Sequence, residues 1–354
     1  MNINLTAPIN KLSYGIVSRN LVFQLDKLGH NISLWTIGNT EVDKQSEIPT
    51  LQKTIGNQAI FDNNSPSVRL FHQFSLEQHV GKGLHVGFPI FELDNFSDRE
   101  KRNLSAQDRL FVCSNWAKEV VSKHLPNLDV RVIPLGTDRS IFYENSQPLD
   151  HDGLYTFLHI GKLEVRKREL ELLECFNRAF EKDDNVELIF MTFNPFLSQE
   201  DMIRWQSKCN SSKLGDKITI LDYVETQHHL AGIMRQCDCL ISLSSAEGWN
   251  LPLLDGMSCG KPIIATNYSA HTEFCTRENS YLIDVDDLEV AQDNKWFDGK
   301  IGSWGKIGES QKAQTVEYMR NVVKNNIRTN PTGVETAKKF SWENSARLFV
   351  ENLE

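Results

Sequence analysis

The sequence lacks long apolar runs, paired-cysteine motifs and a secretion signal. A membrane span needs about 20 consecutive apolar residues, and no run approaches that length in the 354 residues. The seven cysteines form no CxxC pair and no zinc-type spacing with histidine. The start, Met1 to Ala7, has no basic region followed by an apolar core and is predicted to be a strand. We therefore expect free, buried cysteines and a cytoplasmic protein.

The sequence also lacks an excess of positive charge. Its net charge is −9, which disfavours a generic nucleic-acid or anionic-membrane surface. A local basic patch and a peripheral membrane contact stay open, as does the oligomeric state. The composition is 40% hydrophobic and 24% charged, which is typical of a soluble globular protein. The length exceeds one comfortable core, so two domains are expected.

Short apolar runs alternate with helical patterns in the first part of the chain. This alternation predicts an α/β fold with a parallel sheet and crossover helices. The loop from Asn10 to Gly15 carries no G-x-G-x-x-G pattern, which argues against a nicotinamide dehydrogenase. The predicted strands are Ile3 to Ala7, Ile32 to Ile37, Ser67 to Phe74, His85 to Ile90, Leu110 to Cys113 and Val130 to Ile133.

The alternation restarts after a polar linker, Tyr143 to Gly153, and predicts a second domain of the same kind. We place the domains at 1–148 and 149–335, and expect a last helix at 336–354 that packs back toward the first domain. The segment Asp286 to Ser310 shows no clear period and is expected to be an irregular insertion. The second set of predicted strands is Tyr155 to Ile160, Val186 to Met191, Ile218 to Leu221, Cys239 to Leu243, Pro262 to Ala265 and Tyr281 to Ile283.

Two acidic residues follow one predicted strand of the second domain. Glu247 lies on the loop after this strand, and Pro252 marks the first turn of a short helix that carries Asp255. Ligands bind at the carboxyl ends of strands in open α/β sheets. The amides from Trp249 to Leu251 would face an anion. The alternative is an ordinary connection with two solvated acids.

Cations follow another strand of that domain, in the segment Gly161 to Arg168. A glycine turn followed by Arg166 and Lys167 suits a diphosphate, since arginine bridges phosphate oxygens and lysine supplies a point charge. The alternative is a solvated basic helix start, and this segment alone favours that alternative.

Together the two segments resemble the motifs of family 4 retaining glycosyltransferases, whose GT-B fold has two Rossmann-like domains facing across a cleft. The usual signature is Glu, seven residues, Glu, which Glu247 and Asp255 match with one change. The resemblance covers most of the second domain and the end of the first, while the first 60 or so residues match mainly in layout. Further matches in register are V-C-S-N-W at Val112 to Trp116, V-I-P-L-G-T-D at Val132 to Asp138 and F-S-W-E at Phe340 to Glu343.

The resemblance implies a role for each matching residue of the donor site. Glu247 would contact sugar hydroxyls near the reacting carbon, and Arg166 and Lys167 would bind the diphosphate. Asp255 would hold the ribose hydroxyls, although aspartate is one methylene shorter, so this contact would be looser, water-bridged or made by a shifted helix. Asn250 stands where many members have glycine, and its side chain would add a polar contact or cap the helix. The other donor-binding positions are Gly161, Lys162, Trp249 and Leu251 for phosphate or sugar, Tyr223 and Val224 for the nucleobase, and Gly15 on the first loop.

On the acceptor side many members have a histidine, but this chain resembles a W-E-L-type variant with Glu92 at the end of a strand. Glu92 would orient or deprotonate the acceptor; the alternative is a glutamate that only structures its loop. His72 is the other candidate because it also ends a predicted strand, and His79 and His85 follow.

The resemblance predicts transfer of a hexose from a UDP-glucose or GDP-mannose type donor to an acceptor hydroxyl, with retention and without a metal or other cofactor. The partners would be the nucleotide sugar and a glycan, lipid-linked or small-molecule acceptor, with nucleic acid disfavoured. The alternatives are a nucleotide-sugar epimerase or phosphorylase on the same fold and a non-catalytic sugar-nucleotide-binding protein.

Overall fold

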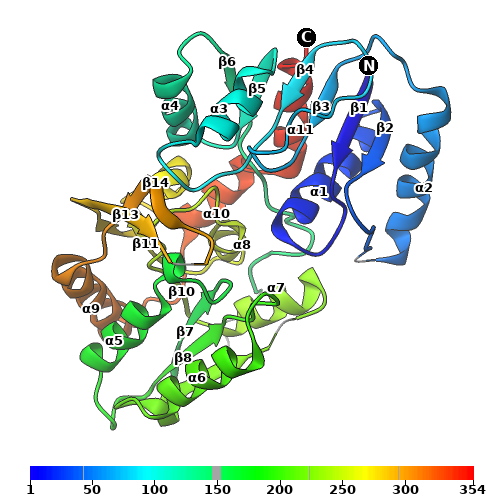
Figure 1. Cartoon of the computed structure of the whole chain (residues 1–354). Coiled ribbons are helices and arrows are strands. Elements are labelled where there is room, and N and C mark those ends of the chain that lie inside the picture. Colours follow the sequence, from blue (N-terminus) through cyan, green and yellow to red (C-terminus); the bar gives the residue numbers. More distant parts are fainter. Residues whose placement is uncertain (43, 146–152, 223, 294) are drawn as a thin grey trace. The chain divides into compact units, whose positions relative to one another are not determined.

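The computed structural model describes residues 1–42, 44–145, 153–222, 224–293 and 295–354 (Figure 1). It consists of two compact units: a first unit of Met1–Asp138 with Lys339–Glu354, and a second unit of Arg139–Lys338. Each unit contains a six-stranded sheet in which every pair of neighbours is parallel. The predicted α/β class with two Rossmann-like domains is confirmed. Among the described residues, no helix is both long and apolar enough to cross a membrane.

The first unit has the strand order β2-β1-β3-β4-β5-β6. The C-terminal helix α11 belongs to this unit, where Phe349 packs 5.3 Å from Phe111 and Ser345 donates a hydrogen bond to the Pro134 carbonyl. The elements are β1 (Asn2–Ala7), α1 (Ser13–Lys27), β2 (Asn31–Thr36), α2 (Ile48–Gly56), β3 (Ser67–Arg69), β4 (His85–Gly87), α3 (Asp98–Ser105), β5 (Arg109–Val112), α4 (Asn115–His124), β6 (Asp129–Val132) and α11 (Trp342–Glu351).

Two strands of the first unit are shorter than predicted. Strand β3 ends at Arg69 instead of Phe74, because the buried Arg69 guanidinium donates to the Ser75 carbonyl and the chain turns around it. Strand β4 ends at Gly87 instead of Ile90. There the Tyr14 hydroxyl both donates to the Ile90 carbonyl and accepts from its amide, so a side chain replaces the neighbouring strand.

The second unit has the strand order β12-β11-β10-β7-β8-β9. Its strands and helices alternate along the chain as predicted until β12. The elements are β7 (Tyr155–Ile160), α5 (Glu169–Ala179), β8 (Val186–Met191), α6 (Gln199–Asn210), β9 (Ile218–Leu221), α7 (Gln227–Gln236), β10 (Cys239–Ser242), α8 (Leu251–Ser258), β11 (Ile263–Asn267), β12 (Tyr281–Asp284), β13 (Leu288–Gln292), β14 (Asp298–Gly305), α9 (Glu309–Lys324) and α10 (Pro331–Lys339).

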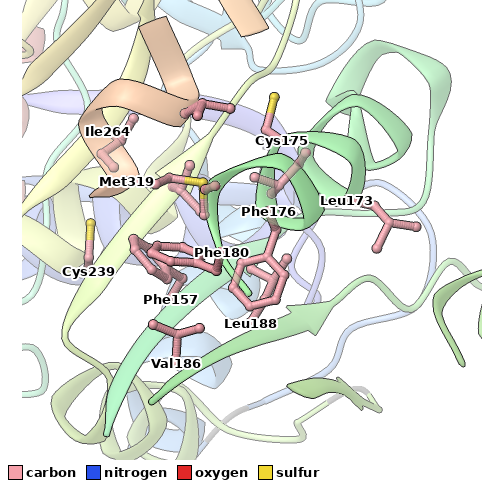
Figure 2. Close-up of a cluster of buried hydrophobic side chains, with 14 of the residues drawn as sticks. Phe157, Leu173, Cys175, Phe176, Phe180, Val186, Leu188, Cys239, Ile264 and Met319 are labelled. Atoms are coloured by element: carbon pink, nitrogen blue, oxygen red, sulfur yellow. The ribbon is translucent and has the colours of Figure 1, made fainter. Parts of the chain in front are cut away.

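The core of the second unit forms between the sheet and helices α5 and α9 (Figure 2). Helix α5 presents Leu172, Phe176 and Ala179 at a spacing of three to four residues, which places them on one face. Phe176 lies 6.5 Å from Phe157 of β7 and 5.5 Å from Phe180. Because this core fixes β7, it also fixes the loop that follows β7.

The segment predicted to be an irregular insertion is an antiparallel hairpin, β13–β14. Leu288 and Val290 are exposed while Ala291 is buried, so apolar residues lie on both faces of β13 and do not mark a buried face in the sequence. The turn is held by the Asp293 carboxylate, which accepts hydrogen bonds from the amides of Lys295 and Trp296.

Candidate functional site

The candidate site lies where two loops of the second unit meet. One loop follows β7 and contains a 3-10 helix, Val165–Lys167; the other follows β10 and contains Glu247. Strands β7 and β10 are neighbours and run parallel. Their carboxyl ends therefore share one edge of the sheet, and residues 80 positions apart in the sequence come into contact there.

The structure brings the predicted cations and the first signature acid together. The Lys167 ammonium lies 2.5 Å from Glu247 Oε1, and Arg166 Nη1 lies 3.1 Å from Glu247 Oε2. Arg166 and Glu247 are each only 5% exposed. Burial raises the pKa of Glu247, but the charges of Lys167 and Arg166 outweigh it and hold that pKa well below its ordinary value. Glu247 is thus an ionised carboxylate held between two cations.

A second carboxylate, Glu164, extends this cluster. Arg166 Nη2 lies 3.2 Å from Glu164 Oε2, and the Lys162 ammonium lies 3.3 Å from Glu164 Oε1. Among the described residues of this cluster, three cations outnumber the two carboxylates, Glu164 and Glu247, which suits the binding of an anion. The 44% exposed Lys162 side chain, whose ammonium also lies 5.4 Å from the Phe196 ring centre, is the most accessible of the three.

Gly161 is placed where a side chain would crowd the cluster. A Cβ at this position would lie 3.3 Å from Lys167 Cδ and 3.5 Å from His159 Nε2. Its lack of a side chain leaves room for Lys167 to cross to Glu247. The glycine turn of the sequence motif thus has a local steric reason.

Asn250 fixes the loop between Glu247 and α8. Its φ of +80° lies in the left-handed region, which explains why glycine suits the same position in relatives of the predicted family. The Asn250 side chain does not cap α8, so that part of the prediction is wrong. Its amide instead donates to His271 Nε2 at 2.9 Å and to Ser242 Oγ at 3.2 Å.

Residues after β11 form hydrogen bonds to the loop that contains Glu247 and Asn250. The Glu247 amide donates to Ser269 Oγ at 2.8 Å. His271 is fully buried, and burial lowers its pKa. The neutral ring lies with Nδ1 3.0 Å from the Thr266 carbonyl and Nε2 accepting from Asn250. Sequence reasoning missed Ser269 and His271, because no motif marks a segment that acts only through tertiary contact.

The other predicted donor residues lie around α8 and β9. The Trp249 indole packs into the core 5.1 Å from Phe274, so a ligand would meet Trp249 through its backbone. Leu251 is the first residue of α8, and Asp255 is buried one turn further on. Burial and then the charge of Asp255 raise the pKa of Cys259 to about 12.

The predicted nucleobase contacts lie between β9 and α7. Val224 is half-buried there, and Tyr223 lies outside the described residues.

Two predicted residues of the first unit, His72 and Glu92, lie near Tyr14, which sequence reasoning missed, while His79 and His85 stack on each other at 4.4 Å. The His72 ring lies 4.7 Å from the Tyr14 ring and is stacked on Phe74 at 5.1 Å. Glu92 lies on the loop between β4 and α3, beyond the strand end where it was predicted. Burial is the main cause that raises the pKa of Tyr14, and the nearby charge of Glu92 adds to it. Both acceptor-side candidates therefore lie close to one phenol.

Gly15 lies in the first turn of α1, not on the preceding loop where it was predicted. A Cβ there would come within 2.2 Å of Asn10 Oδ1. The tight return of the chain onto Asn10 accounts for this glycine without a ligand.

No group of three or more His, Cys, Asp or Glu side chains that could hold a metal ion occurs among the described residues. The sequence has two Asp-x-Asp triplets: Asp150 to Asp152, which lies outside the described residues, and Asp284 to Asp286, at the end of β12. Asp284 is paired with Arg277 at 2.6 Å, and Asp286 Oδ2 accepts from Gln311 at 3.4 Å. Metal independence stays a prediction.

The part of the sequence that contains this site matches a known protein family. Residues 155–293, which contain the whole cation and carboxylate cluster, match the family described as glycosyl transferases group 1. A stretch of 188 residues is 25% identical to O-antigen chain mannosyltransferase B of Escherichia coli and covers 53% of this chain and 42% of that protein. The chain spans about half the length of the curated relatives it matches.

Solved structures match over the whole chain. The sucrose-phosphate synthase of Thermosynechococcus elongatus aligns with a TM-score of 0.73 and 15% identity, over 99% of this chain and 98% of that one. HepE of Anabaena, determined in complex with UDP-glucose, aligns with a TM-score of 0.69 and 13% identity, over 100% and 99% of the two chains. The GT-B fold and the resemblance to glycosyl transferases group 1 are therefore confirmed.

Proposed function

We propose that this chain, whose residues 155–293 match glycosyl transferases group 1, transfers a hexose from a nucleotide-diphosphate sugar to an acceptor hydroxyl with retention of configuration. The observation that carries the proposal is the buried cluster in which Arg166 and Lys167 share the carboxylate of Glu247. Two cations and an ionised carboxylate in one largely buried site suit a ligand in which a diphosphate is joined to a sugar with several hydroxyls.

The cluster supplies the charges that cleavage of a sugar–diphosphate bond needs. As the bond breaks, negative charge grows on the departing oxygens, and Arg166 and Lys167 stabilise it without reorganising. Glu247 accepts hydrogen bonds from sugar hydroxyls near the anomeric carbon, which its lowered pKa permits. Retention follows if the departing phosphate deprotonates the acceptor on the same face of the sugar, a path that needs no protein nucleophile. This chemistry requires neither a metal nor another cofactor.

The relatives suggest which nucleotide sugars to test as donors. HepE of Anabaena was determined with UDP-glucose, and a relative from Mycobacterium tuberculosis is named a GDP-mannose-dependent mannosyltransferase. UDP-glucose and GDP-mannose are therefore the first donors to test. We propose a glycan, a lipid-linked glycan or a small molecule as acceptor, with the first unit supplying Glu92 or His72. Nucleic acid is not proposed, given the net charge of −9. A cytoplasmic location is part of the proposal.

Titration calorimetry with UDP, GDP and ADP, followed by assays of UDP-glucose and GDP-mannose turnover, tests the proposal. We expect one nucleotide to bind and its sugar conjugate to be hydrolysed slowly without an acceptor. Lys167→Met should abolish turnover and weaken nucleotide binding, while Lys300→Met, which removes an exposed lysine paired with Asp298, should leave both unchanged. Binding without turnover on any acceptor would favour a non-catalytic binding protein. No binding of any nucleotide would overturn the proposal.

A further inference from the structure

Arg168 follows directly after the two cations of the site but points elsewhere. It has a φ of +60°, a left-handed conformation that is unfavourable for a residue with a Cβ. Its guanidinium is largely buried, and Nε donates to Ser245 Oγ at 2.6 Å. Nη1 donates to Glu171 at 3.1 Å, and Nη2 donates to Glu289 of β13. The end of the loop that carries Arg166 and Lys167 is therefore held by the β13–β14 hairpin.

The base of this hairpin is joined to both loops of the site. Glu289 also accepts a hydrogen bond at 3.1 Å from Nε1 of the buried Trp304, over whose ring Arg168 lies at 5.7 Å. The Gly305 amide donates to the Ser245 carbonyl, and the Ser245 amide donates to the Arg166 carbonyl, each at 2.8 Å. The end of β14 is thus hydrogen-bonded to the loop that contains Glu247, and that loop is hydrogen-bonded to the loop that contains Arg166.

The tip of the hairpin reaches a third loop, the one that follows β8. Lys295 Nζ donates to the Phe196 carbonyl at 2.6 Å, and the Trp296 and Phe196 rings meet edge to face at 5.5 Å. Phe196 is also the ring against which the Lys162 ammonium lies. Between its base and its tip, the hairpin (orange in Figure 1) connects the loops that follow β7, β8 and β10.

We propose that the β13–β14 hairpin positions the loop that carries Arg166 and Lys167. Glu289 is the positioning residue, and it acts on these two cations through Arg168. Without the Glu289 carboxylate, the buried guanidinium loses its charged partner on the hairpin, and the left-handed turn beside Lys167 loses its restraint. Arg166 and Lys167 would then sample arrangements that do not fit a diphosphate. The effect on a nucleotide ligand rests on the proposed function, but the effect on the loop does not.

Glu289→Gln tests this inference, because glutamine keeps the size of the side chain and an oxygen for Trp304 while it removes the charge. The matched control is Asp298→Asn, which removes an exposed acid from the same hairpin. Hydrogen exchange without ligand should quicken in peptides covering 164–168 and 244–247 in Glu289→Gln and stay unchanged in Asp298→Asn. Trp304→Phe, which removes the indole donor and part of the buried ring, should act in the same direction, so the test survives if Glu289→Gln does not fold.

Calorimetry then measures what the loop does for the ligand. Glu289→Gln should weaken nucleotide binding by roughly 2- to 30-fold, and should weaken it no further in a Lys167→Met background. Unchanged exchange in those two peptides, or the same fold-loss with and without Lys167, would overturn the positioning role. Wild-type protein that binds no nucleotide would instead sink the proposed function, while the exchange result would still decide on the hairpin.

Discussion

The ammonium of Lys167 lies 2.5 Å from the carboxylate of Glu247, although 80 positions separate the two residues in the sequence. Glu247 is buried and the Lys167 side chain is only 12% exposed, and the buried Arg166 contacts the same carboxylate from the same loop. A buried ion pair is weak support for stability, because taking both charges out of water costs about as much as their attraction returns. Its presence at the carboxyl edge of a parallel sheet is better explained by a ligand that shares these charges.

Replacing Glu247 should strongly reduce turnover. Glu247→Gln keeps the size of the side chain but removes the charge, and we expect donor turnover to fall by about 100- to 1000-fold. Glu247→Ala should be at least as damaging, and it should also lower stability because Arg166 and Lys167 then lose the carboxylate that they share. Steady-state kinetics with the preferred nucleotide sugar measures both, beside Glu335→Gln on the exposed end of another ion pair. Near wild-type rates for Glu247→Gln would remove Glu247 from the site.

Stability should decrease as the pH falls from 7 to 5, and His271 should contribute to the decrease. Burial lowers the pKa of His271, so the folded state stays neutral while the unfolded chain takes up a proton below pH about 6.5. The unfolded state then binds more protons, and the free energy of unfolding falls with pH. Burial also lowers the pKa of His79, which acts in the same direction.

Urea unfolding at pH 7, 6 and 5 measures this slope. His271→Gln should show a shallower decrease than the wild type, and His228→Gln, which changes an exposed histidine on α7, should not. The same slope in all three proteins would show that His271 accepts a proton without penalty in the folded state.

Asn250 should be replaced more easily by glycine than by alanine. Both replacements lose the hydrogen bonds to His271 and Ser242, but only alanine must hold a methyl group at a φ of +80°. We expect Asn250→Ala to lower the free energy of unfolding by about 1 kcal/mol more than Asn250→Gly, after allowing for the flexibility of glycine in the unfolded chain. Urea unfolding at pH 7 measures the free energy of unfolding of both variants. Equal losses would mean that the left-handed backbone relaxes in the variants.

The fold class and the placement of Arg166 and Lys167 near Glu247 were predictable, for one physical reason, whereas the ion pairs between them were not predicted. Strand and helix periods are written locally in a parallel α/β chain, and loops after neighbouring parallel strands must meet at one edge. The strand ends at Arg69 and Gly87 were missed because side chains bind the backbone there. Arg69 bonds the Ser75 carbonyl, and Tyr14, which lies far away in the sequence, bonds Ile90.

Residues that act only through tertiary contact left no local signal. His271, Tyr14 and Glu289 belong to no motif in the sequence, and each matters through a partner far along the chain. The hairpin itself was hidden because apolar residues such as Val290 are exposed on it. Only the folded structure reveals these contributions.

Chelation should leave activity unchanged if the cations of the protein neutralise the diphosphate. We expect equal rates with excess EDTA and with added manganese or magnesium, measured by release of the nucleotide. Activity lost with EDTA and restored by manganese would show that a metal shares the diphosphate. Asp284 and Asp286 would then be the first side chains to replace, although Asp284 is bound to Arg277 at 2.6 Å.

Two replacements in the first unit should separate the acceptor-side candidates, which both lie near Tyr14. If Glu92 orients or deprotonates the acceptor, Glu92→Gln should lower kcat for transfer while nucleotide binding stays within about twofold of the wild type, because only the transition state loses an interaction. His72→Gln should then raise KM for the acceptor at most, since the ring is stacked on Phe74. The opposite pattern, with kcat lost in His72→Gln and kept in Glu92→Gln, would transfer the role to His72. If both variants keep kcat but unfold more readily, Glu92 only structures its loop, and the acceptor is activated by the departing phosphate alone.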